Sequence, residues 1–134
     1  MKKRFIFIFP AILLAFLLLA ACSGNKNPPW TSAVSGADTV YGFGDGTAAA
    51  IPSGAQVKTS FKDMQNGKIT FAESGSTILL ANGVIVSAPI NTAVSVTGGV
   101  CTITIGDGEA TVTQTNGMAI TVPSGTVIDH AGNF

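Results

Sequence analysis

The chain contains one histidine, His130, directly after Asp129. A serine hydrolase would need this histidine as general base, with a carboxylate to orient it and a serine nucleophile. The chain has no Gly-x-Ser-x-Gly elbow to supply that serine. Because the residues from Asp129 to Asn133 are common in turns, the sequence favours a solvated turn over a catalytic triad.

Cys101 is the second residue that could have a catalytic role. A catalytic thiol needs a neighbouring base that lowers its pKa. Cys101 instead alternates with Ile103 and Ile105, which predicts a buried, inert side chain on the apolar face of a strand. Zinc needs three or four Cys, His or acidic ligands, and one histidine with one inward cysteine do not supply them. We therefore expect no metal, no cofactor and no catalytic residue.

Acidic residues in glycine-rich turns are candidate ligands for a calcium ion. Asp45 and Asp107 each lie between two glycines, and Glu109 adds a carboxylate near Asp107. Ca²⁺ takes six to eight oxygen ligands, but neither stretch follows the EF-hand pattern. Aspartates are also frequent in turns because they bond to their own backbone. The seven acids of the mature chain form no evident pair for glycoside hydrolysis.

Trp30, Tyr41 and Phe43 form the densest aromatic group outside the first 21 residues. Exposed aromatic rings can stack on sugars or anchor a protein partner. The same residues can instead close one end of a β core. Both interpretations remain open, and these three side chains are the candidate ligand contacts.

The first 21 residues have the three-part layout of a secretory signal. A basic start, Met1–Arg4, is followed by an apolar run to Leu19 and by the small residues Ala20 and Ala21. The run is shorter than the about 20 residues that a membrane-spanning helix needs. It also contains Pro10, which breaks helical hydrogen bonding. We expect residues 1–21 to be removed.

The residues Leu19-Ala20-Ala21-Cys22 resemble the lipobox of bacterial lipoproteins, with the pattern Leu-Ala-(Gly/Ala)-Cys. The resemblance covers residues 1–22 only. It implies diacylglycerol on the Cys22 thiol, cleavage between Ala21 and Cys22, and a mature protein anchored in the cell envelope. Two or more acyl chains give stable anchoring, at about 0.8 kcal/mol per buried CH₂. Ser23, in place of Asp, implies outer-membrane delivery if the host is Gram-negative.

Without the signal, the chain has four lysines, no arginine and seven acidic residues, a net charge of −3. Nucleic-acid binding needs clustered Lys or Arg, so we expect no nucleic-acid partner. The same count argues against a polybasic membrane-binding face. A lipid on Cys22 would leave Cys101 without a disulfide partner, so the hydrophobic core must stabilise the domain.

Residues 38–134 predict a single all-β domain. Turn residues recur about every eight positions, and runs such as Cys101–Ile105 alternate apolar and polar side chains as half-buried strands do. Asn82-Gly83, Asn116-Gly117 and Gly98-Gly99 each predict a two-residue hairpin turn of type I′. Residues 22–37 lack apolar periodicity, so we expect a lipidated cysteine followed by a flexible tether.

The fold that we expect is a small antiparallel β-sandwich or roll of short strands with glycine-rich turns. A weak repeat leaves a short parallel β-solenoid as the alternative, because related segments end in glycines 21, 24 and 26 residues apart. These segments are Ile51–Gly54, Phe71–Gly75, Val96–Gly99 and Val122–Gly125.

The function that we expect is a non-enzymatic structural or protein-interaction module, anchored to the membrane through Cys22. A carbohydrate- or glycan-binding module at the cell surface is the alternative. The partner would accordingly be an envelope protein or a glycan.

Overall fold

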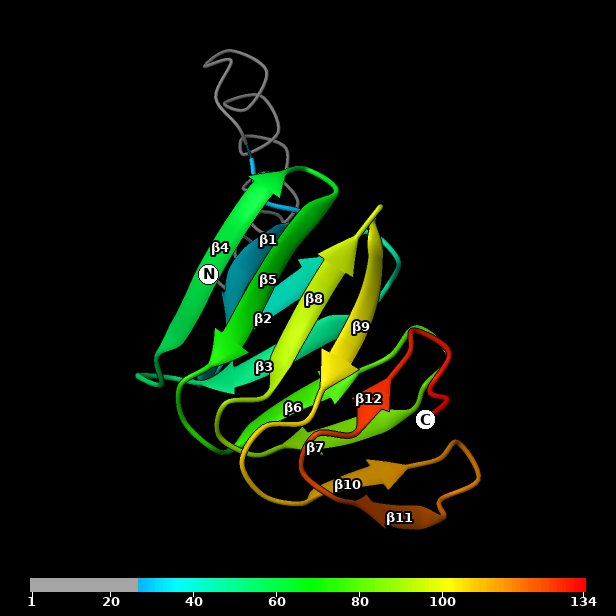
Figure 1. Cartoon of the computed structure of the whole chain (residues 1–134). Helices are drawn as coiled ribbons and strands as arrows, with labels where there is room; N and C mark the ends of the chain where they lie inside the picture. Colours follow the sequence, from blue (N-terminus) through cyan, green and yellow to red (C-terminus); the bar gives the residue numbers. More distant parts are fainter. Residues whose placement is uncertain (1–26) are drawn as a thin grey trace, which may run out of the picture.

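A computed structural model describes residues 27–134 and shows an all-β domain of two facing antiparallel sheets (Figure 1). The expected signal segment, the cleavage site at Ala21–Cys22 and the lipid-bearing Cys22 lie outside the described residues. The seven-stranded sheet has the order β1 (Trp30–Ser35), β2 (Asp38–Phe43), β3 (Ala48–Pro52), β6 (Ser76–Leu79), β7 (Ile85–Ala88), β10 (Ala110–Thr113) and β11 (Ala119–Val122). The five-stranded sheet has the order β12 (Val127–Ile128), β9 (Val100–Thr104), β8 (Ala93–Thr97), β5 (Asn66–Phe71) and β4 (Val57–Asp63).

Successive hairpins alternate between the two sheets. The hairpins β2–β3, β6–β7 and β10–β11 belong to the larger sheet, and β4–β5 and β8–β9 belong to the smaller one. Each hairpin is followed by a crossover to the opposite sheet. Every described pairing is antiparallel. The expected antiparallel sandwich is therefore confirmed, and the parallel-solenoid alternative does not describe this chain.

The turns of these five hairpins gather at one end of the sandwich, which we call the turn end, whereas the β1–β2 turn lies at the other end, where Ser53 N–H donates to Ala37 O. The backbone N–H of Gly99, in the β8–β9 turn, donates to Gln65 O in the β4–β5 turn. The Asn82 side chain, in the β6–β7 turn, donates to Ala131 O in the last turn. A Cβ on Gly46, in the β2–β3 turn, would lie 2.9 Å from Ala81 Cβ.

The crossovers gather at the opposite end, which we call the crossover end. Each contacts the next through backbone bonds: Ala72 N–H donates to Gln56 O, Asn91 N–H to Phe71 O, and Asp107 N–H to Ile90 O. Three segments of the weak repeat, which end in Gly54, Gly75 and Gly125, are crossovers with positive φ at the glycine. The fourth, Val96–Gly99, leads into a hairpin turn. The repeat therefore marks changes of sheet and not coils of a solenoid.

The core lies between the sheets and follows the alternation in the sequence. Cys101, Ile103 and Ile105 are buried, as are Ile69 and Phe71. Across the gap they face buried residues of the larger sheet, among them Ala49, Ile51, Ile78, Val86 and Val112. Period-two burial of this kind is what a sheet with one covered face requires.

Two of the three predicted turns differ from the expected type. At Asn82 and Asn116 the loop has three residues, with bonds from Gly83 N–H to Leu80 O and from Gly117 N–H to Gln114 O. Only the glycine has positive φ, whereas type I′ needs two such residues. Each asparagine keeps negative φ, and its side-chain oxygen accepts the N–H of Val84 or Met118. Gly98 and Gly99 both have positive φ, as a type I′ turn requires.

The expected tether boundary at residue 37 also differs from the structure, because β1 begins at Trp30. Strand β1 pairs with β2 along its whole length, from Trp30 opposite Phe43 to Ser35 opposite Asp38. As an edge strand it inserts Trp30 into the core but leaves Val34 exposed. The sequence therefore shows no apolar alternation there, and the first strand takes up residues 30–35 of the segment that was expected to be a tether.

Candidate functional site

The described surface has a shallow groove on the larger sheet, where β6 and β7 meet the crossover end. Its lining comprises Gly75, Ser76, Thr77, Ser87, Ala88, Pro89 and Glu109, around a volume of about 230 Å³. Thr77 and Ser87 are directly opposite in the β6–β7 register, and their side chains face outward. Glu109 comes from the crossover that precedes β10. The groove thus combines two hydroxyl groups with one carboxylate.

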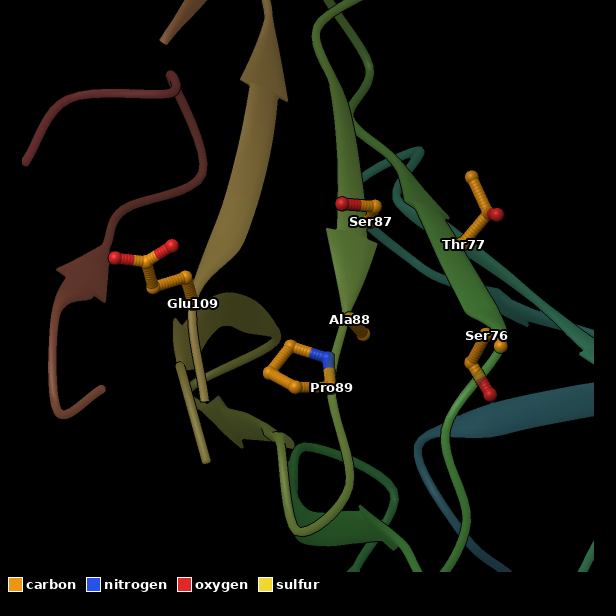
Figure 2. A pocket seen from close by; sticks show the side chains of 7 residues that line it. Ser76, Thr77, Ser87, Ala88, Pro89 and Glu109 are labelled. Atoms are coloured by element: carbon orange, nitrogen blue, oxygen red, sulfur yellow. The ribbon is translucent and has the colours of Figure 1, made fainter. Parts of the chain in front are cut away.

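The polar groups of this groove do not converge. Figure 2 shows Glu109 and Thr77 on opposite sides of Pro89, with their polar atoms directed apart. The Ser87 hydroxyl is already bonded, since it accepts Thr111 N–H at 3.0 Å and lies 3.4 Å from Thr111 O. A general base must lie within about 3 Å of the proton that it removes. This arrangement supports hydrogen bonding to a small polar ligand and offers no nucleophile–base pair.

Ser76 lines the groove but faces the interior, on the same side of β6 as Ile78. Its hydroxyl is buried and has no hydrogen-bond partner among the described residues. Nothing in the sequence distinguishes Ser76, Thr77 or Ser87, because serine and threonine occur in most of the strands. Only Glu109 carried a signal, through its proximity to Asp107 in the sequence.

The three candidate aromatic contacts all face the core. Trp30 is 7% exposed and Phe43 is 6% exposed, and their rings meet edge to face at 6.2 Å. Trp30 also packs edge to face on Phe61, with ring centroids 6.0 Å apart. Tyr41 is half-buried against the same cluster. Trp30 and Phe43 therefore act as a plug at the turn end, where neither ring face is open to a ligand.

Cys101 and Asp45 form a partly buried contact between the two sheets. One Asp45 oxygen accepts the Cys101 backbone N–H at 2.9 Å and the other accepts Thr47 N–H at 3.0 Å. Burial raises the pKa of Asp45, but these hydrogen bonds outweigh it and hold the pKa below 3.8. Burial and the Asp45 charge raise the pKa of Cys101 to about 12. The thiol is therefore protonated and unreactive at neutral pH.

His130 is exposed in the turn that follows β12. The carboxylate of its neighbour Asp129 accepts the backbone N–H groups of Ala131 and Asn133, both at 2.9 Å. These bonds lower the pKa of Asp129, chiefly through Asn133. Asp129 thus stabilises the turn through these two backbone hydrogen bonds.

Asp107 is also engaged locally. Its side chain accepts a hydrogen bond of 2.6 Å from Asn91 Nδ2, and its backbone N–H donates to Ile90 O. Asn91 has φ of 67°, which an asparagine tolerates better than most residues. Residues 27–134 contain no cluster of three His, Cys, Asp or Glu side chains that could hold a metal ion. Asp107 therefore ties two crossovers together.

Among the described residues, no helix is long and apolar enough to span a bilayer. No family model, no curated protein and no solved structure matches this chain.

Proposed function

We propose that this chain is a lipid-anchored envelope protein and that its β-sandwich acts as a non-enzymatic structural or protein-interaction module. The lipobox-like residues Leu19–Cys22 support the anchor. The outer face of the larger sheet supports the module, and this face is the observation that carries the proposal.

That outer face has two cross-strand rows without a charged residue. One row runs Gly42, Ala48, Leu79, Ile85, Thr113, Ala119, and the other runs Val40, Ala50, Thr77, Ser87, Thr111, Thr121. Leu79 and Ile85 are directly opposite and are 46% and 40% exposed. Protein interfaces are depleted of charge at their centre, with apolar side chains surrounded by polar ones. The Leu79–Ile85 pair within its hydroxyl-bearing surroundings has this composition.

Site-specific photocrosslinking in intact cells tests this face. A photoreactive amino acid at position 79 or 85 should give a discrete adduct of higher mass. The matched control is Ser95, on the outer face of the smaller sheet in β8. Absence of a protein adduct from both positions, or equal adducts from position 95, would count against an interaction module on this face.

A glycan-binding role is a second candidate, favoured by the groove and not by the aromatic cluster. The free hydroxyl of Thr77 and the carboxylate of Glu109 could bond to a sugar, and a volume of about 230 Å³ suits a small ligand. A glycan array with and without EDTA, repeated with Glu109→Gln, tests it. Binding that ignores Glu109→Gln would remove the groove from this role.

A further inference from the structure

The described lysines all lie on one hairpin. Lys58 and Lys62 belong to β4, and Lys68 belongs to β5. Lys58 lies opposite Thr70 and Lys68 lies opposite Ser60, so the two lysines are diagonal neighbours on the outer face. Diagonal side chains of an antiparallel pair lie roughly 7–8 Å apart. Lys62 lies two residues beyond Ser60 on the same strand, at the β-bulge between Phe61 and Asp63. All three lysines are exposed, and we call these three residues of the hairpin the basic strip.

Most of the acidic residues lie elsewhere. Five of the seven occupy turns, crossovers or strand ends away from this hairpin: Asp38, Asp45, Asp107, Glu109 and Asp129. The two that adjoin the hairpin are hydrogen-bonded: Glu73 accepts Gln56 N–H at 3.0 Å beside the start of β4. Asp63, next to Lys62, accepts Gln65 N–H and Asn66 Nδ2 in the β4–β5 turn, both at 2.9 Å. The outer face of the smaller sheet continues from the strip through Thr70, Ala93 and Thr104 without a negative charge. A net charge of −3 therefore conceals a locally basic face.

The first residues of the described chain pack against the same hairpin. A Cβ on Gly67 would lie 2.9 Å from Trp30 Cζ3 and 3.0 Å from Pro29 Cδ, so these two residues pack directly on the hairpin. In Figure 1 the first coloured residues lie beside the tip of β4–β5. The tip also exposes Met64, which is 58% accessible. The chain that leads back to Cys22 thus departs from the basic hairpin.

The length of that connection is short. Six residues separate Pro29 from Cys22, so the seven Cα–Cα steps limit the distance to about 25 Å when fully extended and to on the order of 15 Å root-mean-square. The connection contains Lys26 and no acidic residue. Every lysine of the mature chain is therefore either in this connection or on β4–β5.

We infer that the β4–β5 hairpin, with Lys58, Lys62, Lys68 and Met64, docks on the anionic phospholipid headgroups of the membrane that holds the anchor. The inference rests on the lipid anchor of the proposed function. An anionic surface attracts nearby lysines over about one Debye length, and each contributes roughly a fivefold bias toward the bound state. Three lysines favour the docked orientation by roughly a hundredfold. Docking would turn the opposite face, with its Leu79–Ile85 pair, toward partners.

The test uses the lipidated protein reconstituted in vesicles of phosphatidylcholine, alone or mixed with phosphatidylglycerol. A fluorophore on Gln65→Cys, at the hairpin tip, reports contact through quenching by a spin-labelled headgroup lipid, and Thr121→Cys is the matched position on the opposite face. Cys101 is buried and protonated, so it stays unlabelled. We expect quenching at position 65 to exceed that at 121 in anionic vesicles only, and to vanish at about 1 M salt, where the Debye length is about 3 Å.

The decisive variant replaces Lys58, Lys62 and Lys68 with Gln and should reduce quenching at position 65 to the level in neutral vesicles. Its control, Thr77→Glu, Thr115→Glu and Ala119→Glu, changes the net charge equally at exposed positions elsewhere and should keep the quenching. Equal quenching in both triple variants, or in both kinds of vesicle, overturns docking.

Flotation with neutral vesicles tests the anchor separately. If the protein does not float, the anchor is refuted, and docking is then judged by whether excess anionic vesicles quench the probe at position 65. An unchanged probe under those conditions overturns docking as well.

Discussion

Replacing Gly106 with alanine should destabilise the domain more than an alanine at any other described glycine, because its Cβ would make the closest contact. Gly106 lies in the β9–β10 crossover, against the β7–β8 crossover. A Cβ there would lie 2.2 Å from Asn91 C, 2.3 Å from Ile90 O and 2.4 Å from Thr92 N. All three are backbone atoms, so no side-chain rotation can relieve the overlap.

The magnitude follows from what must move. The two crossovers would have to separate by about 1 Å, which is an overpacking cost of about 1–3 kcal/mol. Separation would also weaken the bonds from Asp107 N–H to Ile90 O and from Gly106 N–H to Thr92 Oγ1, of 2.8 Å and 3.1 Å. Each contributes about 1 kcal/mol net. We expect Gly106→Ala to lower the free energy of unfolding by about 3–5 kcal/mol, a large share of the typical 5–15 kcal/mol.

Urea unfolding of the mature chain, followed by Trp30 fluorescence, measures this loss. Gly44→Ala is the matched control, because its Cβ would meet no atom within 4 Å and its φ is not positive. The control should stay within about 0.5 kcal/mol of the parent. If Gly106→Ala unfolds at the same urea concentration as Gly44→Ala, the close approach of the two crossovers is wrong.

Two further predictions concern the Asp45–Cys101 contact. Asp45→Asn should lower stability by about 1 kcal/mol, since a neutral amide accepts weaker bonds. The pKa of Asp45 is depressed below 3.8 in the folded state, so its contribution is present above that value and is lost as pH falls through the folded pKa. Unfolding curves at pH 7 and pH 2.5 should show the difference between parent and variant shrinking, and a constant difference would contradict the charged bond. Cys101, with a pKa of about 12, should resist iodoacetamide at pH 8 in the folded protein and react once urea unfolds it, as mass spectrometry would show. Rapid labelling without denaturant would contradict its burial.

The sequence predicted the strands and their inward faces because period-two alternation is a local property. Cys101, Ile103 and Ile105 are buried as that alternation requires. Strand β1 was not predicted because an edge strand needs few inward-facing apolar residues. Among its described side chains, Trp30 is the one in the buried core. The three-residue loops at Asn82 and Asn116 escaped because Asn-Gly also suits a loop in which only the glycine has positive φ.

The order of hairpins and crossovers was harder to predict from the sequence. Gly98-Gly99 closes a hairpin and Ser74-Gly75 begins a change of sheet, yet both are short glycine turns between strands. The choice between them depends on which neighbour the next strand meets, which is a long-range property. The basic strip could not be predicted for the same reason, because Lys58 and Lys68 become neighbours only through the β4–β5 register. The groove residues Thr77 and Ser87 likewise become adjacent only through pairing of β6 with β7.

The intact mass of the protein extracted from membranes tests the central claim most directly, since both proposals depend on the anchor at Cys22. We predict a chain that begins at Cys22 and carries the mass of diacylglycerol on its thiol, and a Cys22→Ser variant that keeps residues 1–21 and lacks this addition. A chain that begins at Met1, or one that begins at Cys22 with an unmodified thiol, would contradict the account of a lipid-anchored β-sandwich.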